Sequence, residues 1–239
     1  MTYLYLLLNL GTISIPFLFS FHPRLQFAKT WYAFWPACLL TAGIFLVWDV
    51  LFTVWGVWGF NPTYLVGLEW LGLPLEEWLF FICIPYACTF TYACLKKLVK
   101  RDFFGKYAVR ITQGLIIGLT GLGLLNLDQM YTSVTFLLTA AFLVGLLWWR
   151  KPDYLGHFFL AYLVIYAGPF LLVNGTLTGS FIPDQVVWYN NAEKFAIRVF
   201  TIPVEDFIYG MLLYIMNVAF YEELIARRAK KEVGEPVTA

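Results

Sequence analysis

Charged residues are scarce in this chain of 239 residues, at 13% of the sequence, while hydrophobic residues make up 61% and aromatic residues 20%. A soluble domain of this length exposes far more charge, so the composition predicts a polytopic membrane protein. The formal net charge of +1 gives no reason to expect a nucleic-acid partner.

Several motifs are also missing. The four cysteines form no CxxC pair and lie in or beside apolar runs, so we interpret them as packing residues and expect neither disulfides nor a metal site. Glycines 118, 121 and 123 follow no strand, and they fit helix packing better than a nucleotide-binding loop. No cofactor is predicted, although assistance by a flavin stays open.

Seven apolar runs approach the roughly 20 residues that a membrane-spanning helix needs. They cover residues 3–20, 31–48, 76–95, 108–127, 132–149, 155–173 and 200–221. The first run lacks both a basic segment before it and a small-x-small cleavage site, so it reads as a retained helix. The predicted fold class is therefore an all-α polytopic membrane bundle of about seven transmembrane helices.

The positions of the basic residues predict how the bundle is oriented across the membrane. All but two of the sixteen Lys and Arg residues fall in alternate loops or after the last span, and the exceptions are Lys194 and Arg198. Because basic loops stay cytoplasmic, we expect a multi-pass cell-membrane protein with its N-terminus outside and its C-terminus in the cytoplasm.

A short acidic motif occurs twice. Residues 74–77 (PLEE) recur 129 positions later as residues 203–206 (PVED), each at the start of an apolar run. Matching features around both copies predict two three-helix repeats, at residues 1–104 and 130–226, with a linker helix at 105–129 and a basic tail at 227–239. Two directly joined copies of three spans would cross the membrane in opposite directions, and the linker helix reverses the second copy. The repeats should therefore run parallel, related by a pseudo-twofold axis along the membrane normal, with both motifs at the same depth in the membrane.

Four carboxyls beside hydrocarbon need an explanation. Acidic residues in a first helical turn do stabilise the helix dipole, but Glu76, Glu77, Glu205 and Asp206 all adjoin strongly apolar segments. Successive helical residues diverge by about 100°, so we expect one member of each pair to face a cavity and the other to brace it. Carboxyls crowded in a dry pocket cannot all ionise, and a protonated one could protonate a carbon–carbon double bond.

Other side chains could support this chemistry. Asp49 and Asn174 end the second and sixth spans, and we expect them to hydrogen-bond to the acidic motifs. Aromatic faces can stabilise a carbocation, although interfacial anchoring explains many such residues equally well. The aromatic candidates are Trp48, Trp55, Trp58, Tyr64, Trp70, Phe80, Trp188, Tyr189 and Tyr209.

Residues 72–78 (GLPLEEW) and 202–206 (IPVED) resemble the lycopene cyclase domain of heterodimeric bacterial carotenoid cyclases, here with both subunits in one chain. The resemblance covers nearly the whole chain. It implies cyclisation of the linear ends of lycopene to β-rings, giving β-carotene without net redox change, with the four acidic residues as the catalytic ones. Membrane lipid and an acyclic carotenoid are then the expected partners, and self-association or association with other carotenoid enzymes is compatible.

A small-solute transporter is the main alternative, because a three-plus-one-plus-three bundle also suits carriers. Such a carrier should have polar or helix-breaking residues near mid-membrane, and Pro36 and Pro169 keep that reading open. A retinal photoreceptor would need a lysine in the last span, and a polyprenyl transferase would need Asp-rich motifs, and the chain has neither.

Overall fold

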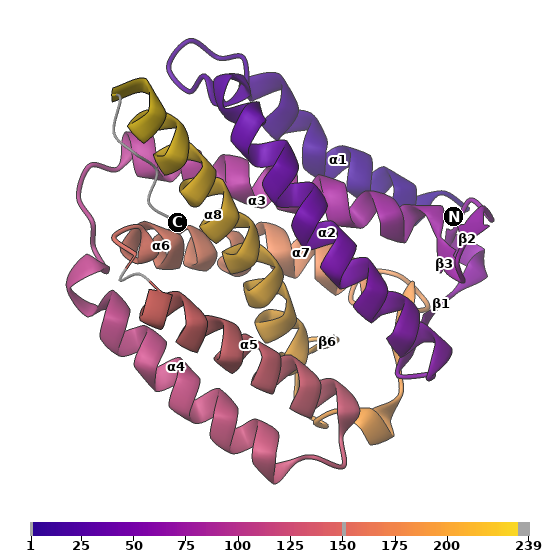
Figure 1. Ribbon diagram of the computed structural model, residues 1–239. Helices are drawn as coiled ribbons and strands as arrows, with labels where there is room; N and C mark the ends of the chain where they lie inside the picture. Colours follow the sequence, from indigo (N-terminus) through magenta and orange to yellow (C-terminus); the bar gives the residue numbers. More distant parts are fainter. Residues whose placement is uncertain (1, 150–151, 234–239) are drawn as a thin grey trace.

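The computed structural model describes residues 2–149 and 152–233, and this part of the chain is a bundle of α-helices (Figure 1). The helices are α1 (Leu4–Phe19), α2 (Trp31–Val54), α3 (Leu75–Leu98), α4 (Gly105–Leu125), α5 (Met130–Trp149), α6 (Leu155–Ala167), α7 (Pro169–Leu177) and α8 (Val204–Val233). The predicted all-α membrane bundle is confirmed. Residues 227–233 of the predicted tail continue α8, and its last six residues lie outside the described part.

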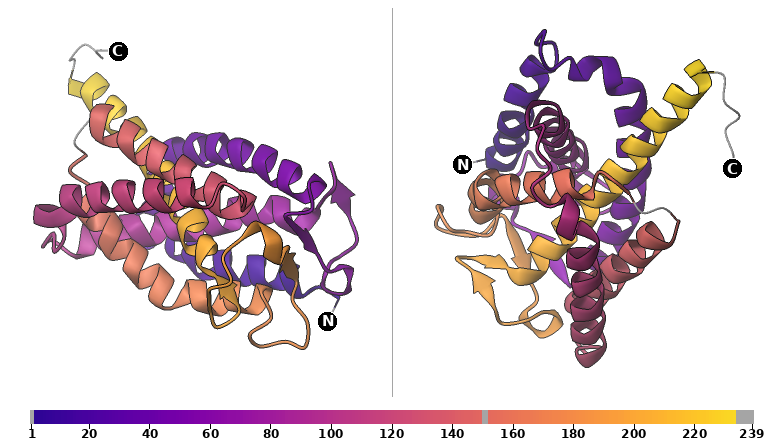
Figure 2. Two further views of the ribbon diagram at one scale, coloured as in Figure 1. Left: turned by 90° about the horizontal axis from the view of Figure 1, so that it is seen from below. Right: turned by 90° about the vertical axis from the view of Figure 1, so that its left-hand side faces the viewer.

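Short strands and 3₁₀ turns connect the helices. The strands are β1 (Trp58–Phe60), β2 (Glu69–Trp70), β3 (Leu73–Pro74), β4 (Val187–Tyr189), β5 (Arg198–Val199) and β6 (Ile202–Pro203). The 3₁₀ turns are η1 (Phe27–Thr30), η2 (Pro62–Tyr64) and η3 (Asn191–Glu193). The strands gather with the N-terminus at one end of the bundle, whereas α8 ends at the other (Figure 2). We call these the strand end and the basic end.

Two of the seven expected spans differ from simple transmembrane helices. Within the described residues, five helices are long and apolar enough to cross a membrane. The sixth expected span breaks at Gly168 into α6 and α7, which are bent by 50°. Pro169 explains the break, since proline lacks the N–H that the helix ladder needs and disfavours helical geometry before it. Helix α1 has 16 residues, about 24 Å at 1.5 Å per residue, shorter than a typical hydrocarbon core.

The helices pack in reciprocal pairs. Helix α1 packs on α3, as α5 packs on α8. The second helix of each predicted repeat crosses to the other one, so α2 packs on α8 while α6 packs on α3. Helix α4 packs on α5 and α6 at the side of the bundle, away from α1 and α2. The two predicted repeats therefore share the main buried core.

The loops before the two acidic motifs share their local structure, position by position, with an offset of 129 residues. Asn61 accepts a hydrogen bond from the Thr63 amide, and Asn190 accepts one from the Ala192 amide. The ladder β2–β3 pairs Glu69 with Pro74, while β5–β6 pairs the corresponding residues Arg198 and Pro203. These matches support the internal repeat, which stays a prediction.

Strands β1 and β4 join the two loops across the molecule. They run antiparallel, with Gly59 opposite Trp188 at the centre of the ladder. These two residues also correspond under the offset of 129, so the ladder pairs a position with its own counterpart. Such pairing is what a twofold axis through the ladder produces. A side chain at Gly59 would collide with the Trp188 indole, which explains the glycine there.

Candidate active site

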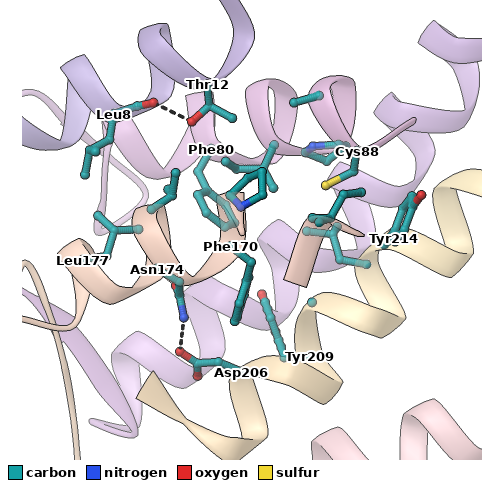
Figure 3. Close-up of a pocket in the computed structure, with 18 of the residues that line it drawn as sticks. Leu8, Thr12, Phe80, Cys88, Phe170, Asn174, Leu177, Asp206, Tyr209 and Tyr214 are labelled. Atoms are coloured by element: carbon teal, nitrogen blue, oxygen red, sulfur yellow. Dashed lines mark hydrogen bonds between the residues drawn. The ribbon is translucent and has the colours of Figure 1, made fainter. Parts of the chain in front are cut away.

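A cavity of about 590 Å³ lies inside the bundle, within the usual range for small-molecule sites. Helices α1, α3, α6, α7 and α8 form its walls, and strands β1 and β4 line it at the strand end. Figure 3 shows α1 residues on one side, α7 residues on the other and Phe80 between them. Of the described residues that line this cavity, the charged ones are Asp49, Glu77 and Asp206.

The four predicted catalytic acids divide into two kinds. Glu77 and Asp206 line the cavity, whereas Glu76 and Glu205 are fully buried elsewhere and do not line it. This division follows from helix geometry, because the second acid of each motif is rotated by about 100° from the first. This arrangement agrees with the prediction that one acid of each motif faces the cavity while the other braces the structure around it.

Glu76 and Glu205 hold the loops that precede them. Glu76 Oε1 accepts a hydrogen bond from the Val66 amide at 2.6 Å, and Glu205 Oε1 accepts one from the Phe195 amide at 2.7 Å. Thr132 adds a second donor to Glu205. The other oxygen of each glutamate is buried without a hydrogen-bond partner among the described residues. Both side chains thus satisfy partly buried loop amides that would otherwise lack a protein partner.

The first carboxyl cluster consists of Asp49 and Glu77. Glu77 Oε2 accepts a hydrogen bond from the Tyr5 hydroxyl at 2.5 Å, and Asp49 Oδ1 accepts one from Trp58 Nε1 at 2.6 Å. Asp49 Oδ2 is buried without a hydrogen-bond partner among the described residues, and the two carboxyls lie close enough to interact electrostatically. Two carboxyls can share a hydrogen bond when one carries a proton, so this cluster is built to hold one.

The second cluster surrounds Asp206 with donors. Its Oδ1 accepts from the Tyr131 hydroxyl at 2.6 Å, and its Oδ2 accepts from Asn174 Nδ2 at 2.7 Å and from the Tyr189 hydroxyl at 2.9 Å. Figure 3 shows the Asn174 bond. Burial and the neighbouring Asp206 raise the pKa of Tyr189 well above its ordinary value, so its hydroxyl remains a donor. Three donors on one carboxyl are the environment of an ionised group.

Aromatic rings fill the space between the clusters. Tyr209 lies edge-on to Trp48 at 5.0 Å and to Trp58 at 5.8 Å between ring centroids. Tyr131 stacks on Tyr189 at 5.7 Å. Of these rings, Trp48 does not line the cavity and buttresses Tyr209 from behind. The π-electron faces of such rings can stabilise positive charge that develops in the cavity.

Most of the predicted supporting residues are at the site. Asp49, Asn174, Trp58, Phe80 and Tyr209 all line the cavity. Asp49 and Asn174 lie toward the ends of α2 and α7, Phe80 and Tyr209 lie in the first two turns of α3 and α8, and Trp58 begins β1. All five elements adjoin the acidic motifs or the loops before them.

Several predicted supporting residues, namely Trp55, Tyr64, Trp70 and Trp188, do not line the cavity. Trp55 is 56% exposed at the end of α2, where its ring packs on Phe52, so it fits the interfacial reading. Tyr64 is buried in a separate apolar cluster with Tyr5, outside the cavity lining. Its hydroxyl accepts a hydrogen bond from the Asp184 amide. Closeness to the acidic motif in the sequence therefore does not decide whether an aromatic side chain faces the cavity or points away from it.

Two tyrosines at the site, Tyr5 and Tyr131, were not among the predicted residues, whereas Tyr189 was one of the aromatic candidates. Tyr5, Tyr131 and Tyr189 supply the hydroxyl donors to Glu77 and Asp206. Tyr5 and Tyr131 lie at the starts of the first helix of each predicted repeat, and this matching position was the available signal. Aromatic residues are so frequent in this chain that the signal does not stand out.

Fold and site together define a membrane-embedded helical protein with an acidic centre at the end of an apolar cavity. A family model described as lycopene cyclase matches residues 2–95 and 128–224, and the chain belongs to this family. Membership supports a carotenoid cyclase function with an acyclic carotenoid as substrate. Comparisons with curated proteins and with solved structures give no significant match. Among the described residues, no group of three or more His, Cys, Asp or Glu could hold a metal ion.

The bracing role of Glu76 predicts different results for two substitutions. In Glu76→Gln the side-chain oxygen still accepts from the Val66 amide, so we expect folding and most of the cyclase activity to be retained. In Glu76→Ala the partly buried Val66 amide loses its partner, which should lower the free energy of unfolding by about 1–3 kcal/mol. Thermal melting in detergent and pigment conversion measure the two effects. Loss of activity in a stably folded Glu76→Gln would contradict a purely bracing role.

Proposed function

We propose that the protein converts the linear ends of lycopene to β-rings, giving β-carotene through a carbocation without net redox change. The proposal is supported mainly by the arrangement of the buried carboxyls. Two carboxyl clusters with opposite hydrogen-bonding environments border the same apolar cavity, one suited to hold a proton and the other suited to stay ionised.

The reaction needs one proton in and one proton out for each ring. A proton added to C2 of the terminal C1=C2 double bond leaves a cation at C1. The electrons of the C5=C6 double bond then form the C1–C6 bond and move the positive charge to C5. Loss of the proton from C6 restores the C5=C6 double bond and completes the β-ring. Acid and base catalysis by two positioned carboxyls meets both needs.

We assign the acid to the Asp49–Glu77 cluster and the base to Asp206. Two neighbouring buried carboxyls, with Asp49 Oδ2 lacking a donor among the described residues, support a proton held within the Asp49–Glu77 pair. The donors from Tyr131, Asn174 and Tyr189 support an ionised Asp206. Different environments that drive two carboxyls to opposite protonation states are how acid and base roles are separated in other enzymes.

A buried amine strengthens this difference between the clusters. Lys194, 2% exposed, interacts electrostatically with Glu205 and Asp206, while the corresponding position of the first repeat is Leu65. Burial, followed by the neighbouring Arg198, lowers the pKa of Lys194. A positive charge on that amine favours the ionised form of Asp206, and the first cluster has no such neighbour at the matching position.

The surroundings of the clusters suit a short-lived cation. Trp58 and Tyr209 line the cavity and present aromatic rings near the carboxyls. Strands β1 and β4 also line it at the strand end, which limits the access of water from that side. Keeping water out prevents hydroxylation of the cation before the ring closes.

The duplicated motif builds one reaction centre under this proposal. Because Glu77 and Asp206 border the same cavity, one contributed by each repeat, a single end of the carotenoid can react at a time. The second end then has to enter after the first ring has formed.

A small-solute carrier explains the cavity less well. A carrier would need polar groups along a path between both faces, whereas the charged groups of this cavity are concentrated in two clusters and its other walls are largely apolar. With the basic end in the cytoplasm, the acidic centre lies toward the outer face, and the N-terminus lies outside.

Replacement of either cavity-facing acid should abolish conversion. In a lycopene-accumulating bacterium the unaltered chain should turn red pigment to orange, whereas Glu77→Gln and Asp206→Asn should each lower the rate by about 10²-fold or more. Chromatography of the extracted pigments measures the conversion. Glu76→Gln is the matched control, since it makes the same chemical change one residue away and outside the cavity. Undiminished activity in both cavity variants would refute the assignment.

Solvent isotope should report the two proton transfers. In membranes equilibrated with deuterium oxide, each ring formed should gain one deuterium at C2 and lose the original hydrogen at C6. Mass spectrometry should therefore find β-carotene with two added deuterons, and nuclear magnetic resonance should locate them. Rings without deuterium would exclude protonation by a solvent-exchangeable carboxyl.

One shared centre predicts a free intermediate. Early in the reaction, carotenoid with one ring should accumulate before carotenoid with two, and added excess lycopene should delay the second ring. A time course separated by chromatography measures both species. Two rings formed together from the earliest times, unaffected by excess lycopene, would indicate two centres.

A further inference from the structure

The cavity reaches the side of the bundle between two helices. On α1, Leu7, Gly11 and Ile15 are spaced four residues apart and therefore share one face of the helix. All three line the cavity, yet all three are exposed, with Leu7 at 62% and Ile15 at 66%. A residue that is both exposed and cavity-lining lies at a mouth. One edge of that mouth is this stripe of α1.

Helix α7 forms the opposite edge. Pro169 and Leu172 line the cavity and are exposed, Leu172 at 63%. Pro169 begins α7 at the break, where the chain turns by 50° away from the direction of α6. Figure 3 shows the labelled residues of α1 and α7 on opposite sides of the pocket.

The mouth offers almost no polar group to a ligand. Thr12 is the hydroxyl residue of α1 that lines the cavity, and it donates its hydrogen to the carbonyl of Leu8 within the same helix. The exposed residues of α1 near the mouth are mostly large and apolar, among them Leu10 and Leu18. An apolar opening surrounded by apolar surface is unfavourable in water and suits hydrocarbon.

We propose that the gap between α1 and α7 is a lateral portal through which an acyclic carotenoid enters from the hydrocarbon of the membrane. This inference rests on the proposed function. The leading end of the polyene passes Gly11 and Leu172 and reaches Glu77 and Asp206, while the rest of the chain stays among lipid tails. The substrate therefore need not cross water, in which it is insoluble.

Gly11 controls the width of this portal. A Cβ built at Gly11 meets no atom within 4 Å, so a side chain can start there without displacing a neighbour. It would nevertheless occupy the gap itself. Gly43 of α2 is a matched control, since it is also exposed, helical and free of neighbours within 4 Å, but it does not line the cavity.

The test compares Ala, Leu and Phe at both positions in membranes supplied with lycopene. At position 11 the initial rate should fall as the side chain grows, by about tenfold or more for Phe. The same series at position 43 should leave the rate unchanged. Any product made by the position-11 variants should contain the same deuterium per ring as that of the unaltered chain, because the portal does not touch the chemistry.

A flat series at position 11, with the expected loss in Glu77→Gln, would overturn the portal and leave the proposed function intact. Lycopene left acyclic by the unaltered chain would instead reject the proposed function and the portal with it. Should Gly11→Phe fail to fold, Leu172→Trp on the opposite edge decides the question. Its control is Leu163→Trp, an exposed position of α6 that does not line the cavity. A rate lowered by Leu172→Trp alone supports the portal, and equal rates overturn it.

Discussion

A carboxyl group placed in an apolar interior must either find hydrogen-bond donors or hold a proton, and the rest of this structure depends on that constraint. Five such groups lie buried near the strand end: Asp49, Glu76, Glu77, Glu205 and Asp206. Loop amides, tyrosine hydroxyls, an indole and an amide side chain donate to them. The loops and helix ends that supply these donors are thereby fixed in place.

The two motifs look nearly identical in sequence, but their cavity-facing members meet different neighbours. Glu77 is next to a second carboxyl, Asp49, where Asp206 is next to an amide, Asn174. Tyr189 adds a hydroxyl to Asp206, whereas Phe60 stands at the corresponding position of the first repeat and has none to give. Under the proposed function, the predicted repeats with unequal partners place an acid opposite a base.

Apolar side chains form most of the wall of the cavity that the carboxyl clusters border. Since α2 packs on α8 and α6 packs on α3, the cavity lies where the two predicted repeats interlock, and both contribute to its walls. The ladder β1–β4 lines its strand end, and the side between α1 and α7 carries exposed apolar residues. Under the proposed function, the arrangement that limits access of water to the reacting carbons would also give a hydrocarbon substrate a way in.

By itself the sequence determined the fold class, the approximate positions of the helices and the importance of the doubled acidic motif, because hydropathy and helical periodicity are local properties. It also indicated that adjacent acids would face different ways. Only the tertiary structure decided that Glu77 and Asp206 are the members that meet in one cavity, and that Tyr5 and Tyr131 come from distant helices to bind them. Likewise, it excluded Trp55 and Tyr64 from the lining and broke the sixth span at Gly168. Those outcomes depend on how helices far apart in the chain are rotated and packed against one another, which no stretch of neighbouring residues specifies.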